Sequence, residues 1–415
     1  MLDFIKNRTI NRNRYRTVSD AVIISCFFNP QKSQYRSKAF NVFYDSIKHL
    51  NHRIVECVIG DAEPEIELTD SITRVYSDSM LWHKESLLNG IIKNLPAKFK
   101  YVFWIDADVI FSNLNWLVDS VEQLQLSNIL QPFSTCVHLE RNELRPSFDV
   151  EKFKYMYLPN TYNSKVWHSF CNNYVSTQLW LDERYDAHGH VGFAWGARRE
   201  VLDKVPLYDK ALIGGADHIM AHAAVGQINH PCVTKAFTNT EILHEINEWS
   251  REFSKVIDGR VGYVKGNLYH IWHGDLEKRQ YLKRIQDFNE HAKNIVDKDS
   301  NGLYIANEES CDYVKRYFKK REVSNDDLPY SSRISYTSEH GIINQLDVDT
   351  FLDFSKNQDD QSKSELINEF SGFGDGSFGG GGAGGEWGSE DKIEISYDSS
   401  SDSSSYDSSS SENYS

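Results

Sequence analysis

The 415-residue chain lacks a long hydrophobic run, an excess of basic residues and any closely spaced pair of cysteines. No apolar stretch approaches the roughly 20 residues that a membrane helix needs, so no membrane span is expected. Lysine and arginine number 45 against 60 acidic residues, a formal net charge of −15. Because a nucleic-acid surface needs a basic stripe, we expect no nucleic-acid partner. The six cysteines are scattered without a CxxC pair, which predicts reduced thiols in a reducing compartment.

The two ends of the chain differ from its middle in composition. Residues 1–19 are basic and carry no apolar segment typical of a signal peptide or anchor, so an N-terminal extension and a cytoplasmic protein are expected. Residues 372–415 hold nine acidic residues and one lysine among glycine and serine repeats. Such a composition cannot bury enough surface to fold, which predicts a disordered tail that serves as a flexible end, a phosphorylation target or a tether.

A strand, a helix and a second strand begin the predicted fold. Residues 21–28 and 53–59 are continuous apolar runs typical of buried strands, and residues 35–50 have apolar side chains at helical intervals. This order implies a βαβ unit, a parallel sheet and an α/β fold. Asp61 follows the second strand, at the sheet edge where ligands bind. It is either a contact to a ribose or base, or a turn residue after glycine.

The stretch that organises the chain is YVFWIDADVIFSN, residues 101–113. Alternation along a strand places Asp106 and Asp108 on one side, with Ala107 facing away. Two carboxylates at the end of a buried strand are costly unless something compensates them. Paired oxygen ligands suit Mn²⁺ or Mg²⁺, and such a metal can hold a diphosphate. The alternative is a strand end with two solvated aspartates.

An amphipathic helix is predicted at residues 79–95, closed by Pro96. Its Lys84 either approaches a diphosphate or lies on a solvated face. The remaining periodicity predicts helices at 116–126, 166–181, 199–205, 219–225 and 310–322, a short strand at 129–133, loop-rich structure at 138–165, and one or two short elements at 340–370.

Two later stretches carry candidate ligand-contacting residues. In HVGFAWGARR, residues 190–199, glycine alternates with aromatic residues, which marks a bend or a close ligand approach. Trp195 there is either a stacking platform or a core residue. Asp217 follows two glycines at the start of a predicted helix. It is either a helix cap, or a general base that the helix N-terminus keeps ionised.

A pair of histidines three residues apart occurs near residue 270. His270 or His273, with His273 preferred, is a candidate to complete the metal site begun by the two aspartates. The alternative is that both histidines lie on the surface. Arg279, six residues on, offers a cation to a leaving diphosphate.

Taken together, YVFWIDADVIF, HVGFAWGARREVL, GGADHIM and YHIWHG make the chain resemble glycosyltransferases of the GT-A fold. The AWG…GGAD arrangement is similar to the tryptophan-glycine and Gly-Glu-Asp region of inverting galactosyltransferases. This resemblance implies a Rossmann-like, mostly parallel sheet flanked by helices over residues 20–298. A helical or irregular extension at 299–371 is expected to follow it.

The resemblance also implies roles for individual residues. Asp106 and Asp108 match the family's metal and diphosphate motif, and His273 matches its late metal-binding histidine. Asp217 matches the aspartate that deprotonates the acceptor. The implied cofactor is Mn²⁺ or Mg²⁺, the donor a nucleotide-sugar, expected to be a UDP-sugar, and the acceptor a glycan or protein hydroxyl attacked with inversion. The glycine- and serine-rich tail would fit a microbe or a large DNA virus, whose protein would occupy the host cytoplasm or the virion.

Two other classes of protein remain as alternatives. A metal-dependent nucleotidyltransferase also uses paired aspartates, but it favours a glycine-rich loop after the first strand, and FFNPQKSQYR contains no glycine. A catalytically inactive sugar-binding or scaffold protein keeps the fold without metal binding. The presence of Asp106, Asp108 and Asp217 argues against that alternative.

Overall fold

The computed structural model describes residues 18–141, 143–145, 161–163, 189–274 and 277–321, all within one compact unit. The predicted helix at 166–181, the elements at 340–370 and the tail at 372–415 lie outside these residues. So does most of the predicted loop-rich region at 138–165.

The central element is a seven-stranded sheet in the order β10-β6-β9-β4-β1-β2-β3. All neighbours pair in parallel except β9, which is antiparallel to both β4 and β6. The predicted α/β fold with a mostly parallel sheet is thus confirmed. Its strands are β1 (Ala21–Phe28), β2 (His52–Ile59), β3 (Ile72–Ser77), β4 (Tyr101–Ile105), β6 (Ile129–Gln131), β9 (Ala194–Arg198) and β10 (Val261–Tyr263).

A second sheet lies beyond the end of β4, in the order β5-β11-β7-β8. The apolar run at 101–113 therefore divides into β4 and β5, with Asp106, Ala107 and Asp108 at the junction. The strands of this sheet are β5 (Val109–Phe111), β7 (Thr135–His138), β8 (Thr161–Asn163) and β11 (Asn267–His270).

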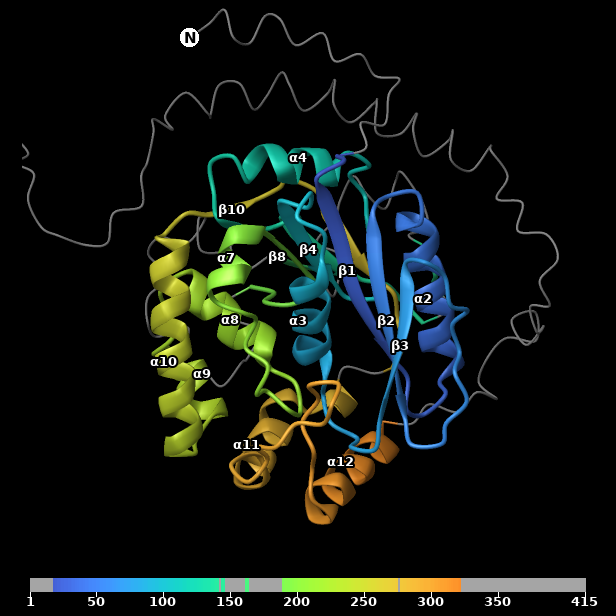
Figure 1. The fold of residues 1–415 in the computed structure, drawn as a ribbon, viewed down its shortest axis with the longest axis vertical. Helices are drawn as coiled ribbons and strands as arrows, with labels where there is room; N and C mark the ends of the chain where they lie inside the picture. Colours follow the sequence, from blue (N-terminus) through green and yellow to red (C-terminus); the bar gives the residue numbers. More distant parts are fainter. Residues whose placement is uncertain (1–17, 142, 146–160, 164–188, 275–276, 322–415) are drawn as a thin grey trace, which may run out of the picture. The chain divides into compact units, whose positions relative to one another are not determined.

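Helices cover both faces of the central sheet, as Figure 1 shows for α2 and α3. Alternate residues of β1 face opposite sides: Ile24 packs in the core that includes α3, α7, α8 and α10, whereas Ile23 packs in the core that includes α2 and α4. The helices are α2 (Gln34–Ile47), α3 (Lys84–Asn94), α4 (Trp116–Gln123), α7 (Arg199–Lys204), α8 (Ala216–Ala224), α9 (Pro231–Ala236), α10 (Thr240–Ile257), α11 (Tyr281–Ala292) and α12 (Glu308–Lys320), with a 3₁₀ turn η1 (Glu277–Arg279).

Several elements differ from the sequence-based expectation, among them the helices α3 and α10. The helix expected at 79–95 begins only at Lys84, because the preceding segment is a loop whose Trp82 donates its backbone N–H to the carbonyl of Leu212 at 2.8 Å. The 18-residue helix α10 was not predicted from the sequence, because many of its residues are charged. Its N-cap, Asn239, accepts two backbone N–H groups, and its apolar stripe faces the core.

Gly196 is a position where the central sheet has no room for a side chain. It lies opposite Phe103 in the antiparallel β4–β9 pair. A Cβ added at Gly196 would lie 2.3 Å from the Phe103 ring, which is itself fully buried. The ring covers the glycine backbone, so this residue is required for packing between the strands.

We predict that Gly196→Ala destabilises the protein by about 1–3 kcal/mol, the usual cost of overpacking a core. Urea melts would show this as a lower midpoint. The matched control is Gly90→Ala within α3, where an added Cβ meets no heavy atom within 4 Å. That change should stabilise the helix by up to about 1 kcal/mol. An unchanged midpoint for Gly196→Ala would contradict the packing described here.

Candidate functional site

A cavity of about 600 Å³ opens at the carboxyl ends of β1 and β4. The strand order reverses between these two strands, because the chain passes outward through β2 and β3 and then returns to place β4 on the other side of β1. Open α/β sheets bind ligands at such a switch point. Six of the seven predicted site residues line the cavity: Lys84, Asp106, Asp108, Asp217, His273 and Arg279.

Asp61 is the predicted residue that the structure does not bring to the others. It follows Gly60 at the end of β2, is exposed, and is not among the residues lining the cavity. Gly60 has a φ of 56°, so the two residues form the turn that leaves β2.

Lys84 joins two carboxylates from separate elements. Its Nζ lies 2.6 Å from Oδ1 of Asp106 and 3.0 Å from Oδ2 of Asp217. Burial opposes the charge of Lys84, but the two carboxylates outweigh burial and raise its pKa well above the usual value. Burial, together with the nearby charges of Asp217 and Asp108, raises the pKa of Asp106 to about 6 despite the lysine. Three chain segments are thus tied together by one buried cation.

The local backbone explains how Asp106 and Asp217 reach the lysine. The N–H of Asp106 donates to the carbonyl of Phe193 at 2.7 Å, and Phe193 has a left-handed φ of 76°, which is rare for a bulky residue. Gly215, with a φ of 103°, is the N-cap of α8, so Asp217 lies in the first turn and is not the cap. Oδ2 of Asp217 comes within 3.2 Å of where a Cβ on Gly192 would be, so the glycine leaves room for this carboxylate.

Asp108 meets two histidines through the pairing of the second sheet. Strand β11 runs beside β5, opposing His270 to Val109, and the N–H of Ile271 donates to the carbonyl of Asp108 at 2.9 Å. Nε2 of His273 lies 2.9 Å from Oδ2 of Asp108 and 3.3 Å from Nε2 of His270. The sequence pointed to one histidine of the pair, and the structure brings both to Asp108.

The protonation states suit a metal ligand set. Burial, with the charge of Arg279, lowers the pKa of His273 to about 3, and burial holds the pKa of His270 well below its usual value. Burial opposes ionisation of Asp108, but the two histidines and Arg36 outweigh it and lower its pKa. One carboxylate and two neutral imidazoles result at pH 7, the forms in which these groups bind metals.

The hydrogen bonds around His273 also favour a cation at this point. Its Nε2 lies between Asp108 and Nη2 of Arg279, 3.0 Å away, and one ring nitrogen cannot donate to the first and accept from the second together. Oδ1 of Asp108 is buried without a hydrogen-bond partner among the described residues. The residues therefore fit a divalent ion. Imidazole ligands suit Mn²⁺ better than Mg²⁺, which prefers oxygen.

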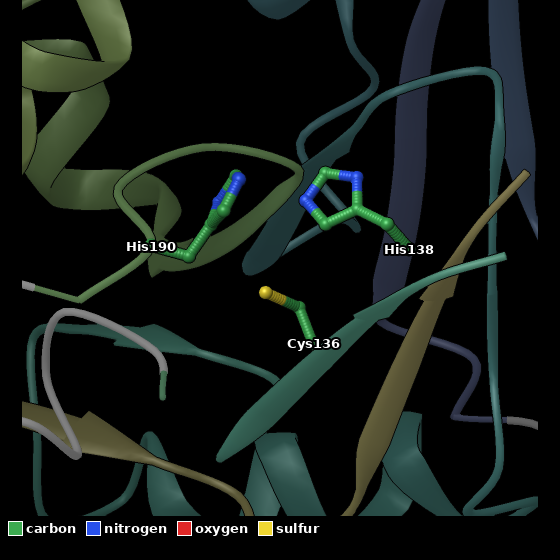
Figure 2. Close-up of side chains that lie close together, drawn as sticks. All are labelled: Cys136, His138 and His190. Carbon is green, nitrogen blue, oxygen red and sulfur yellow. The ribbon is translucent and has the colours of Figure 1, made fainter. Parts of the chain in front are cut away.

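Three further side chains beside the cavity were not predicted from the sequence. Cys136, His138 and His190 lie close together, with the sulfur directed toward the two rings (Figure 2). Nδ1 of His138 lies 2.9 Å from Nδ1 of His270, so His138 helps to fix the orientation of the His270 ring beside Asp108. The sequence gives little indication of this cluster, because Cys136 and His138 lie on a short strand and His190 lies in a distant loop that contains glycine.

Helices α11 and α12 supply another part of the cavity wall. Phe318 stacks on Trp82 with centroids 5.5 Å apart and an interplanar angle of 9°. Nη1 of Arg284 donates to the hydroxyl of Tyr317 at 2.6 Å, and Arg284 and Arg321 both line the cavity. Of these two cationic side chains, Arg284 lies in the predicted 20–298 domain, and Arg321 lies in the region that sequence patterns assigned only to an extension.

Comparison with known proteins gives limited information. No family model matches the chain, and no curated protein matches it. Among solved structures, the chain is similar to glucosyl-3-phosphoglycerate synthase from Mycobacterium tuberculosis with Mn²⁺, UDP and glucosyl-3-phosphoglycerate, at 11% identity over 66% of this chain and 79% of that chain, with a TM-score of 0.33. The chain is also similar to the same enzyme with Mg²⁺ and UDP, at 10% identity over 68% of this chain and 81% of that chain, with a TM-score of 0.33. These scores are too low to support an inference about fold or function.

In the part of the chain that the structure describes, no helix is both long enough and apolar enough to cross a membrane.

Glu85 provides a test of the electrostatics beside Lys84. Burial raises the pKa of Glu85 from 4.5 to about 8, although the charge of Lys84 opposes this rise; the nearby Asp217 and Asp106 contribute to it. Between these pH values the folded protein holds a proton that the unfolded chain has lost, so the stability contribution of Glu85 falls as pH rises, by at most about 1.4 kcal/mol per pH unit.

We therefore predict that Glu85→Gln raises the melting temperature relative to the native protein at pH 8, and that the difference shrinks toward pH 5. Glutamine keeps the volume and cannot ionise. The control is Glu252→Gln, at an exposed position of α10, which should leave the pH dependence unchanged. A constant difference across this pH range would contradict the assignment.

Proposed function

We propose that this chain is a metal-dependent glycosyltransferase of the GT-A type, which moves a sugar from a nucleoside-diphosphate sugar to a hydroxyl acceptor. The observation that carries the proposal is the convergence at the β1/β4 switch point of Asp106, Asp108, His273 and Asp217, which come from three separated stretches of sequence. The order of these residues along the chain is the order that the resemblance to GT-A enzymes implies.

The donor diphosphate would lie against the side of the cavity that holds the ligand set. Asp108, His270 and His273 would hold Mn²⁺, and Asp106 would complete the aspartate pair. The ion stabilises the negative charge that develops on a leaving diphosphate. Arg279, which lines the cavity beside His273, would add a cation to the same leaving group.

Asp217 is proposed to take the proton of the acceptor hydroxyl. Its Oδ2 lies 3.0 Å from Nζ of Lys84, and it lies in the first turn of α8 at the cavity. Donor binding would draw Lys84 toward the diphosphate, which would weaken its bond to Asp217 and leave the carboxylate free to accept a proton. The hydroxyl would then attack the anomeric carbon from the face opposite the leaving group, so the product is inverted. UDP is the proposed nucleotide, and a glycan or protein hydroxyl is the proposed acceptor.

The two alternatives have less support. The loop after β1 is held by Asn29, whose side chain bonds Ser33 and Glu65, and it has no glycine-rich phosphate cradle of the kind a nucleotidyltransferase uses. An inactive sugar-binding protein would have the same cavity without turnover. A screen of nucleotide-sugars that counts released nucleoside diphosphate, with and without Mn²⁺, distinguishes these functions.

We predict that Mn²⁺ and UDP together stabilise the native protein against heat. A ligand at 100 times its dissociation constant adds about 2.7 kcal/mol to the free energy of unfolding. Asp108→Ala should abolish this rise, because it removes the carboxylate of the ligand set. Asp61→Ala is the control, since Asp61 lies away from the cavity lining, and it should retain the rise. An unchanged melt of the native protein with several nucleoside diphosphates would refute the metal-diphosphate site.

A second prediction concerns Asp217→Asn. Asparagine keeps the shape but cannot take a proton at neutral pH, so turnover should fall roughly 10²–10⁴-fold, measured as nucleoside diphosphate released on acceptor addition. Stability should fall by about 1–3 kcal/mol, because Lys84 loses one of its two carboxylate partners and α8 loses a carboxylate in its first turn, so the melting temperature is measured beside turnover to show that the variant is folded in the assay.

The matched control for that experiment is Asp203→Asn, at a half-exposed residue in α7 whose partner is Arg199. Its turnover should equal that of the native protein. Near-native turnover in Asp217→Asn, or a product with retained anomeric configuration, would remove the base role from Asp217 and leave the metal site unaffected.

A further inference from the structure

A second cluster of metal-binding side chains begins at the residue after Asp217. His218 and His222 are four residues apart on α8, and Cys232 lies in α9. Each offers a ligand atom within 4.8 Å of the others. The two histidines are 1% and 0% exposed, so both imidazoles are removed from bulk solvent. A third imidazole, His230, lies beside the sulfur.

In this cluster two imidazole nitrogens, one of His222 and one of His230, face the single thiol proton of Cys232. Nδ1 of His222 lies 2.8 Å from the carbonyl oxygen of His218, which can only accept, so Nδ1 carries the proton and Nε2 presents a lone pair. That lone pair faces Sγ of Cys232 at 3.2 Å. On the other side, Nδ1 of His230 lies 2.9 Å from the same sulfur and accepts the N–H of Cys232 at 3.3 Å. The single thiol proton can serve only one of these nitrogens, whereas a cation between them would serve both.

We infer that His218, His222, His230 and Cys232 bind one zinc ion, at a site separate from the Asp108 ligand set. Imidazole nitrogen and thiolate sulfur are the ligands that Zn²⁺ takes in four-coordinate sites. With Zn–N near 2.0 Å and Zn–S near 2.3 Å, the ligand atoms of a tetrahedron are about 3.3–3.6 Å apart. The observed 3.2 Å and 2.9 Å nitrogen–sulfur separations need to open by roughly 0.3–0.6 Å. The ligand atom of His218 lies within 4.8 Å of those of His222 and Cys232.

Two further features fit the assignment. The bond from Nδ1–H of His222 to a backbone carbonyl is the outer-shell contact that zinc-bound imidazoles usually make. Zinc binding changes no oxidation state, so it needs no oxidant. The thiol of Cys232 gives its proton to solvent, and its sulfur forms the bond to zinc with its own electron pair. His230 exchanges the long contact to the Cys232 N–H for the metal.

The zinc ion has a structural role. Four protein ligands close the coordination sphere, as in structural zinc sites. The ion joins α8 to α9 and fixes the helix that begins beside Asp217, and His218 also lines the cavity. The inference concerns metal content and does not depend on the proposed transfer reaction.

The full-length protein, freed of metal and reconstituted with Co²⁺ as a spectroscopic probe for zinc, tests the inference. A thiolate ligand gives a near-ultraviolet charge-transfer band that an oxygen and nitrogen site, such as the one at Asp108, does not. We expect the band in the native protein at about one cobalt per chain, displaced by about one equivalent of Zn²⁺. Cys232→Ser should abolish it.

Two matched cysteine controls locate the metal. Cys136→Ser alters the other cysteine–histidine cluster, and Cys311→Ser alters a cysteine in α12; both should keep the band. His230→Asn retains a side chain that caps α9 but removes the imidazole, and it should weaken zinc binding by more than the roughly 10–100-fold that outer-shell changes give.

Native protein without a thiolate band would overturn the inference. So would a band lost in Cys136→Ser and kept in Cys232→Ser. Melts of each variant with and without a chelator separate folding from binding: the native melting temperature should fall with chelator and recover with Zn²⁺ but not Mg²⁺. A folded Cys232→Ser protein that keeps native zinc affinity would also refute the site.

Discussion

The pairing of β11 with β5 and β7 is the constraint on which the site depends. It places His270 opposite Val109 on one side and opposite His138 on the other. Without this register, the histidines near residue 270 would not meet a carboxylate more than 160 residues earlier in the sequence. A one-residue slip would turn His270 to the other face of the sheet, because side chains alternate along a strand.

The charged groups that line the same cavity also depend on one another. Lys84 is positive in a buried place and is acceptable there only because Asp106 and Asp217 flank it. The negative charge of Asp106 in turn depends on that lysine, since burial and the other aspartates favour its protonated form. The position of each of these three groups therefore depends on the other two, although Asp217 lies 133 residues after Lys84 in the sequence.

Sequence patterns predicted those elements whose formation depends mainly on neighbouring residues in the chain. Continuous apolar runs identified β1, β2 and β4, and the acidic residues after β4 were predicted to contact a ligand; in the structure they line the cavity. The half-exposed edge strand β3 was not predicted, because its side chains lack a clear apolar pattern. The lysine bridge and the pairing of both histidines with Asp108 could not be predicted, because they arise from contacts between distant segments. His138 and Cys136 have no recognisable spacing to His190, so only the folded chain places them together.

The stacking of Phe318 on Trp82 has a consequence for how the protein is made. All strands of the central sheet have been synthesised once the growing chain reaches Tyr263. Part of the cavity wall comes later, from Arg284 in α11 and from Arg321 directly after α12. A nascent chain can therefore assemble its sheet on the ribosome well before it can enclose a ligand. The complete cavity forms only late in translation, after the end of α12 has left the exit tunnel.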